Sequence, residues 1–405
     1  MASNKMTQLE HEAEDDEILE ELEAEEAESA ASTVSQIEKK YDEGQARIII
    51  QRNDFLVPNL LAMCERKEVM DVSPSYQRRA RWNDIKRSHL IESLLMNIPI
   101  PPIFLYEGDY AKYEVMDGQQ RLAAIRTFFR NEFKLRGLKK WPELNGRDFR
   151  DLPPKIQRGL ERRGLAAVII LTESSKSPTA AMEIRQYVFE RLNTGGEQLN
   201  AQEIRNCLYA GTFNELLVSL ARSDDFTQVW GIPTRESTEP HKVTRKLEKN
   251  PLYSKMADCE IVLRYFALKE LSHFKGGMKK ALDDCMIRNR DLDRSQCEAL
   301  GHEYAEALSI ALSVFGTKLF RLEKDGDLSG RRSVPLADGI LIACGKLRDH
   351  REKLATSASA IVSATVTALQ NRDKHELLVG RGNTKKAVEQ RLTEMESVIS
   401  EAAQL

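Results

Sequence analysis

The sequence is poor in cysteine and lacks a long apolar run. Its six cysteines contain no CxxC pair, and the two nearest lie 12 positions apart, which argues against a zinc knuckle and a disulfide framework. The first residues lack the apolar core of a signal peptide, and no stretch approaches the roughly 20 apolar residues that a membrane span needs. We therefore expect a reduced, cytoplasmic protein with no membrane partner.

Positive charge is scarce at one end of the chain. Residues 1–30 carry twelve Asp and Glu against the single Lys5, so the net charge of −3 leaves about +8 on the other 375 residues. A mildly basic body suits phosphate-bearing partners. The acidic tail either competes with such partners or is simply a solvated appendage.

Strand patterns are frequent before about residue 213 and nearly absent after it. The first part predicts β-branched strands at 46–51, 69–72 and 166–171, and a hairpin in which "IFLYE" and "KYEVM" flank a turn at Gly108 and Asp109. The second part shows helical periodicity at 256–272, 296–322, 335–348, 355–370 and 384–403.

These patterns predict an α+β fold with a separate helical part. We expect an acidic, disordered or loosely helical tail at 1–42, a mixed domain at 43–212 and an α-helical domain at 213–405, with a linker or mobile loop near 234–250. Helix starts are expected at Pro58, at Asn83 or Asp84, and at Asn200, where Glu203 has capping-box spacing.

Five residues of unusual type follow the strand "KYEVM" directly: Asp117, Gly118, Gln119, Gln120 and Arg121. Without a ligand, Asp117 would cap the following helix, Gly118 would relieve backbone strain, and Asp117 with Arg121 would form a pair worth only ~0.5 kcal/mol. The two glutamines remain unexplained, because a first helical turn favours Glu or Asp.

A phosphate over this turn explains more of these residues. Free N–H groups and the helix dipole favour an anion, and Arg121 adds a charge-assisted contact of roughly 1.5 to 3 kcal/mol. The amides of Gln119 and Gln120 can bridge phosphate oxygens or orient a water. Asp117 would repel a bare phosphate, so it must then hold Mg²⁺, a ribose hydroxyl or the attacking water.

Two other connections also carry polar residues or glycines. "PSYQRRARW" follows a strand and contains Tyr76, Gln77, Arg78, Arg79 and Arg81. Its arginines suit nucleotide phosphates and nucleic-acid backbone equally well, or are plain surface charge. In "RLNTGGEQLN", Gly195 and Gly196 either let the backbone approach a ligand or end the preceding helix.

The motifs occur in one order within residues 46–210: "YQR" with a following Trp, "LIESLL" with "IPIPPIFL", "VMDGQQRL", and "RLNTGG" with "LNAQEIRN". This series resembles the family typified by the N-terminal, GmrS-like part of the GmrSD type IV restriction enzymes and by the N-terminal part of SspE. The helical remainder, including "LLVGRGNTKKAVEQRL", resembles the region that follows in single-domain members.

The resemblance implies a ParB/sulfiredoxin-like fold followed by an all-helical domain. It further implies binding and hydrolysis of an NTP at the "DGQQR" turn, with Mg²⁺ or Mn²⁺, and a second nucleotide-binding motif at Tyr76, Gln77 and Arg78. Members act in prokaryotic defence against phage or modified foreign DNA, and many are joined to an HNH nuclease. The seven histidines of this chain are isolated, so any nuclease is expected to be a separate partner protein.

Three functions are therefore compatible with the sequence. In an NTP hydrolase, Arg78 and Arg121 would neutralise phosphate charge, a glutamine would position water, Asp117 would hold the metal or orient that water, and the loop with Asn193, Gly195 and Gly196 would be a lid or wall. In a non-catalytic DNA-binding module, Arg78, Arg79 and Arg81 would contact the backbone. A structural or regulatory protein of the same fold is the third.

Overall fold

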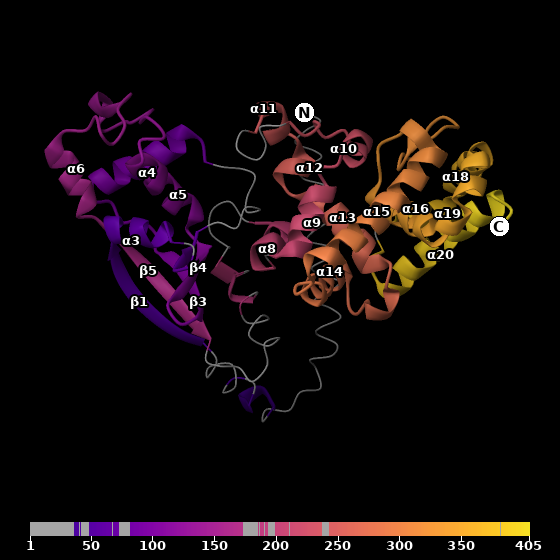
Figure 1. The fold of residues 1–405 in the computed structure, drawn as a ribbon, viewed down its shortest axis with the longest axis horizontal. Helices are drawn as coiled ribbons and strands as arrows, with labels where there is room; N and C mark the ends of the chain where they lie inside the picture. Colours follow the sequence, from indigo (N-terminus) through magenta and orange to yellow (C-terminus); the bar gives the residue numbers. More distant parts are fainter. Residues whose placement is uncertain are drawn as a thin grey trace.

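The computed structural model describes residues 36–39, 41, 48–66, 68–72, 82–172, 185, 187–189, 191–192, 199–209, 211–236, 243–380 and 382–405. A mixed α/β part with one sheet comes first in the chain, and a largely helical part follows (Figure 1). The predicted α+β class with a helical second half is confirmed. The predicted tail boundary at residue 42 lies outside the described residues.

The first part is built on a five-stranded sheet with the order β1-β5-β3-β4-β2. Its strands are β1 (Ile48–Leu56), β2 (Met70–Asp71), β3 (Ile103–Asp109), β4 (Lys112–Asp117) and β5 (Gly164–Thr172). β1 runs antiparallel to β5, β3 is parallel to β5 and antiparallel to β4, and β2 is parallel to β4. The predicted strands are present, and β1 continues five residues beyond its expected end at Gln51.

The hairpin between β3 and β4 turns later than the sequence suggests. Gly108 and Asp109 lie in β3, and the turn is at Tyr110 and Ala111, where Ala111 has a φ of 54°. The carboxylate of Asp109 accepts a hydrogen bond from the N–H of Tyr110 and pairs with Lys112 at 2.8 Å. These contacts stabilise the tighter connection, so the prediction of a Gly108–Asp109 turn is wrong by two residues.

Helices cover one face of the sheet. They are α3 (Val57–Cys64), α4 (Asp84–Leu95), α5 (Gln119–Phe129), the short η1 (Pro142–Leu144) and α6 (Pro154–Glu161). Asn83 caps α4 by accepting a hydrogen bond from the N–H of Lys86. Ile103, Leu105, Val115 and Ile169 of the sheet pack against Leu122 and Ile125 of α5 in one hydrophobic cluster. This packing fixes the direction in which α5 leaves the end of β4.

A second hydrophobic cluster joins the opposite face of the sheet to the helical half. It contains Tyr106, Met116 and Ile170 of the sheet, Phe189, and apolar residues of the later helices. Those helices are α8 (Ala201–Leu208), α9 (Thr212–Leu220), α10 (Asp224–Trp230), α11 (Arg245–Glu248), α12 (Pro251–Ser254), α13 (Ala257–Leu268), α14 (Met278–Arg288), α15 (Arg294–Phe315), α16 (Val334–Lys346), α17 (Arg351–Thr356), α18 (Ala358–Gln370), α19 (Arg372–Val379) and α20 (Lys385–Ala402).

The expected linker at 234–250 is partly folded. Residues 237–242 lie outside the described ranges, but Leu247 of α11 is fully buried in the second cluster. Asn250 then caps α12 by accepting a hydrogen bond from Tyr253. A single buried leucine therefore anchors a segment whose composition resembles a linker.

The buried thiols lead to a first prediction. All six cysteines are buried and free, and desolvation raises the pKa of Cys64 and Cys285 to about 11 and that of Cys344 to about 12. Because the thiolate is the reactive form, we expect less than about one thiol per chain to react with Ellman's reagent at pH 8 in the folded protein. All six should react in guanidinium chloride. Rapid reaction of several thiols without denaturant would contradict the described packing.

Candidate functional site

The chain passes from β4 to α5 through a glycine that no other residue can replace easily. Gly118 has a φ of +98°, and it is the N-cap of α5. A Cβ atom added there would lie 2.6 Å from Cγ2 of Ile103, which is fully buried. Both the backbone conformation and the close packing therefore require glycine at this position.

Replacement of Gly118 tests this requirement. We expect Gly118→Ala to lower the free energy of unfolding by about 2–4 kcal/mol, since it adds overpacking to left-handed backbone strain. Gly146→Ala is the matched control, because Gly146 has a φ of +83° and no heavy atom within 4 Å of an added Cβ. The control should lose only about 1–2 kcal/mol in chemical denaturation. Equal losses in both variants would show that contact with Ile103 contributes nothing.

Asp117 and Arg121 form an ion pair across the first turn of α5. Nη2 of Arg121 lies 2.7 Å from Oδ2 of Asp117, and it also donates to the carbonyl oxygen of Pro102 at 3.2 Å. The Arg121 side chain is 15% exposed and that of Asp117 is 41% exposed. The Nε atom of Arg121 is buried and has no hydrogen-bond partner among the described residues. The predicted ion pair is confirmed.

The prediction that Asp117 caps the helix is wrong. Gly118 is the N-cap, and no side chain accepts a hydrogen bond from the first turn of α5 in the described structure. The Asp117 carboxylate is held by Arg121 instead. The amino end of α5 therefore keeps N–H groups that no side-chain cap satisfies, and these groups carry the positive end of the helix dipole.

Each of the two glutamines has one structural contact. Gln119 donates from Nε2 to the carbonyl oxygen of Val115 at 2.9 Å, and Oε1 of Gln120 accepts a hydrogen bond from the N–H of Trp82 at 3.3 Å. Both residues are half-buried. Among the described residues, these contacts leave the amide oxygen of Gln119 and the amide nitrogen of Gln120 for another partner.

The second motif lies outside the described residues, whereas the residues that flank it on both sides are described. Tyr76, Gln77, Arg78, Arg79 and Arg81 fall within residues 73–81. Before them, β2 pairs in parallel with β4, and Asp71 is opposite Glu114. After them, the N–H of Trp82 donates a hydrogen bond to Oε1 of Gln120, and Nζ of Lys86 lies 5.1 Å from the centroid of the Trp82 ring. Both ends of the segment are therefore attached to β4 or to the turn that follows it.

The loop that contains "NTGG" is described only at its edges. Asn193, Gly195 and Gly196 lie outside the described residues. Before them, the helical residue Arg185 forms an ion pair with Glu114 of β4, and its guanidinium lies 5.3 Å from the ring centroid of Tyr106. After them, Asn200 and Glu203 form the predicted capping box at the start of α8.

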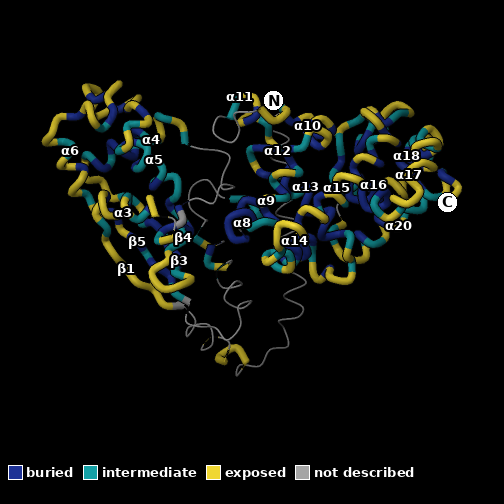
Figure 2. Tube along the Cα trace, in the orientation of Figure 1, coloured by how far each residue is buried: buried dark blue, intermediate teal, exposed yellow. Residues whose placement is uncertain are grey.

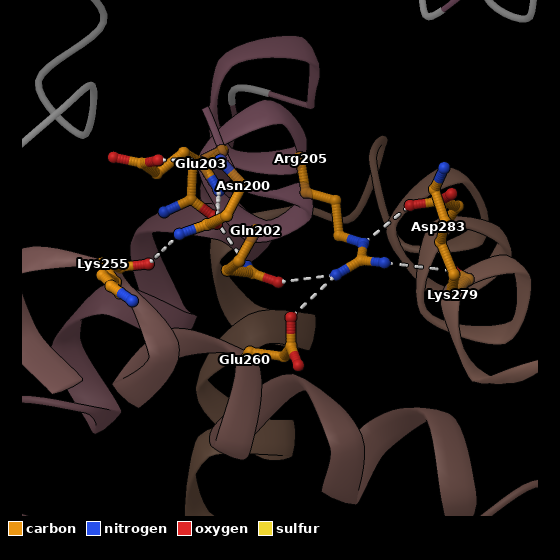
Figure 3. A network of polar contacts seen from close by, with 9 residues as sticks. Asn200, Gln202, Glu203, Arg205, Lys255, Glu260, Lys279 and Asp283 are labelled. Atoms are coloured by element: carbon orange, nitrogen blue, oxygen red, sulfur yellow. Dashed lines mark hydrogen bonds and ion pairs between the residues drawn. The ribbon is translucent and has the colours of Figure 1, made fainter. Parts of the chain in front are cut away.

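The segment "LNAQEIRN", which follows this loop, contributes an arginine to the helical core, and the sequence did not reveal this role. Arg205 is 2% exposed, and its Nε atom donates to Asp283 at 2.6 Å. Its Nη1 contacts Glu260 at 3.1 Å and Gln202 at 3.2 Å, and its Nη2 donates to the carbonyl oxygen of Lys279 (Figure 3). This network ties α8 to α13 and α14. The only signal in the sequence is an arginine on a helix whose other residues are largely apolar or capping.

No preformed metal site is found within the described ranges. The described residues contain no group of three or more His, Cys, Asp and Glu that could hold an ion. Asp117 is nevertheless compatible with Mg²⁺, since this ion is commonly held by one or two carboxylates together with phosphate oxygens. Among the described helices, none has the length and apolar character required to cross a membrane.

Residues 59–210 match the family model described as the N-terminal domain of the GmrSD restriction endonuclease. This match includes β2 to β5, the turn and α8, and it confirms the predicted family resemblance for that segment. The predicted nucleotide motif and the relation to SspE stay predictions. Comparison with curated proteins gives no match. A solved Pnob8-like ParB-N domain, in its C2221 form, is similar over 87% of this chain and 99% of its own, with 12% identity and a TM-score of 0.23.

Proposed function

We propose that the turn from Asp117 to Arg121 binds a nucleoside triphosphate with a divalent cation and hydrolyses it, and that the chain works in a DNA restriction or defence system. The description of the matching family, which names a restriction endonuclease, supports the setting. The observation that supports the site is the amino end of α5, which has no side-chain cap among the described residues and lies beside the guanidinium of Arg121.

The electrostatics of the turn favour a phosphate group. The first N–H groups of α5, which have no side-chain cap in the described part of the chain, attract an anion together with the helix dipole, and Arg121 places a cation in the same turn. Nη2 of Arg121 is held by Asp117 and Pro102, so the guanidinium is oriented before any ligand arrives. A preoriented arginine loses less side-chain entropy when it binds phosphate.

The carboxylate of Asp117 explains why the proposed site would require a divalent cation. Its carboxylate neutralises Arg121 in the described structure. If a phosphate takes the place of the Asp117 carboxylate on Arg121, that carboxylate needs a new positive partner. Asp117 would then hold Mg²⁺ or Mn²⁺. The bound ion would supply charge neutralisation on the phosphate oxygens. Gln119 and Gln120 would use their remaining amide groups to contact a phosphate oxygen or to orient water.

The short connection from Arg78 to Trp82 allows the second motif to contribute to this site. Arg78 is four residues from Trp82, so their Cα atoms are at most about 15 Å apart along the chain. Because Trp82 is hydrogen-bonded to Gln120, an arginine side chain at position 78 can meet a ligand placed over the turn. We infer that Tyr76, Gln77 and Arg78 form the second side of the nucleotide site and that Asn193, Gly195 and Gly196 form its wall.

A nucleotide panel tests the proposal. Phosphate release and melting temperature would be measured with the four NTPs and four dNTPs, each with Mg²⁺, with Mn²⁺ and with EDTA. We expect release with at least one nucleotide, and a stabilisation of about 2.7 kcal/mol when that ligand is present at 100 times its Kd. EDTA should abolish the release. No release and no rise in melting temperature with any nucleotide would overturn the proposal.

A second function, DNA binding, is favoured by a basic segment. Residues 126–163 contain twelve Lys and Arg against five Asp and Glu, a net charge of +7 in a chain whose total is −3. On and next to α6, Lys155, Arg158 and Arg162 are exposed and follow helical spacing. Clustered exposed cations of this kind bind phosphate backbone irrespective of sequence.

Charge reversal on α6 tests DNA binding separately from turnover. We expect Lys155→Glu with Arg158→Glu and Arg162→Glu to weaken binding of a 20-base-pair duplex. The slope of log K against log salt should fall by about 0.9 for each DNA phosphate that the protein no longer neutralises. Nucleotide turnover should remain, because these residues lie outside the turn. An unchanged affinity and salt slope would exclude this surface.

A further inference from the structure

Strand β1 is an edge strand with an exposed surface. Within the described residues it pairs with β5 and with no other strand. Every residue from Ile49 to Leu56 is exposed except the half-buried Phe55, and Figure 2 shows exposure along most of this strand. Long edge strands carry a row of unpaired N–H and C=O groups, which makes them templates for pairing with another strand.

One face of β1 carries an ordered set of side chains. Alternation along a strand places Ile50, Arg52, Asp54 and Leu56 on the same face. Ile50 is 59% exposed and Leu56 is 49% exposed, so two apolar side chains flank a cation and an anion in the order apolar, positive, negative, apolar. Natural edge strands are commonly protected by charged side chains, especially lysine, or by proline, whereas the two charges on this face have opposite signs.

This order is complementary to itself when the strand direction is reversed. If Asn53 of one copy lies opposite Asn53 of a second copy, Arg52 of each copy faces Asp54 of the other, and Ile50 faces Leu56. The neighbouring two-fold registers are worse, because one centred on Arg52 puts Arg52 opposite itself and one centred on Asp54 puts Asp54 opposite itself. Opposite charges directly across a sheet stabilise the pair, and like charges destabilise it.

We propose that two copies of this chain form a symmetric dimer by antiparallel pairing of β1, centred on Asn53. The contact is isologous, so it closes on itself and produces no filament. It joins the two five-stranded sheets into one. β5 and β3 separate β1 from β4 in the sheet order, so the turn from Asp117 to Arg121 remains open in the dimer. The dimer is thus independent of the proposed nucleotide chemistry.

Sedimentation of the full chain tests the dimer. The wild type should show a concentration-dependent rise towards twice the chain mass of 46.1 kDa. Arg52→Asp alone and Asp54→Arg alone each create two like-charge contacts per dimer, and each should raise the dissociation constant at least about tenfold. The double variant, with both substitutions, restores opposite charges and should return the constant to within about threefold of wild type.

The matched control is Lys112→Asp, which disrupts the exposed pair with Asp109 at the β3–β4 turn. It should leave the dissociation constant unchanged, and circular dichroism should show that all variants fold. A wild type that is monomeric at about 100 μM would overturn the proposal. So would a dimer that the single substitutions do not weaken, or a double variant that dissociates as readily as the single ones.

Discussion

Replacing Arg121 with Ala is expected to reduce the proposed nucleotide hydrolysis at least about 100-fold, because it would remove the cation that faces developing phosphate charge in the proposed site. The loss should appear in kcat and in kcat/KM, since the contact is strongest when charge accumulates on the transferred group. The change also frees the carboxylate of Asp117, which Arg121 holds at 2.7 Å. Steady-state phosphate release with the preferred nucleotide measures the effect.

Arg130→Ala is the matched control for this substitution. Arg130 follows the last residue of the same helix, α5, and pairs with Glu65 in an exposed contact. Its removal should change turnover by less than about twofold and stability by less than about 1 kcal/mol. If both variants keep wild-type turnover while both fold, Arg121 has no role in hydrolysis.

Replacing Arg205 with Met is expected to destabilise the protein by about 3–5 kcal/mol. Arg205 is buried and partners Asp283, Glu260, Gln202 and the carbonyl oxygen of Lys279. Methionine retains much of the side-chain volume but removes the Arg205 guanidinium from the Asp283 carboxylate, which is 13% exposed. A buried charge that loses its partner has this cost, whereas an intact pair contributes little.

Chemical denaturation compares the free energy of unfolding of Arg205→Met with that of a surface control and of a double variant. Arg294→Ala removes a pair with Glu298 on the surface of α15, where the Arg294 side chain is 91% exposed, and should cost less than about 0.5 kcal/mol. The double variant Arg205→Met with Asp283→Leu should recover part of the loss, because neither charge is then buried alone. If Arg205→Met lowers the free energy of unfolding by less than about 1 kcal/mol, solvent must compensate the carboxylate of Asp283.

Short-range sequence patterns predicted most of the helices and strands. Asn83 and the pair of Asn200 and Glu203 cap their helices as predicted, because a cap depends on a few adjacent residues. The helical spacing of the second half likewise predicted α13, α16, α18 and α20 to within a few residues, whereas the segment expected at 296–322 ends as α15 at Phe315.

Two local predictions were wrong, and one contact between distant residues was not predicted. The hairpin turn is displaced because Asp109 pairs with Lys112, which a Gly-Asp signal does not reveal. Asp117 binds Arg121 instead of capping α5, since Gly118 with its positive φ takes the N-cap position. Arg205 meets Asp283 across 78 residues, and no local pattern predicts such a partner. The sequence singled out Asp117 to Arg121 as the candidate turn, whose role stays a prediction, and the contacts around the turn needed the structure.

The measurement that bears most directly on the central claim is phosphate release by wild type beside Gln120→Ala and Arg121→Ala, with melting temperatures to confirm that each variant folds. The proposed site predicts turnover in the wild type, a loss of at least about 100-fold with Arg121→Ala, and a clear loss with Gln120→Ala. Equal turnover in all three proteins would contradict a nucleotide site at this turn.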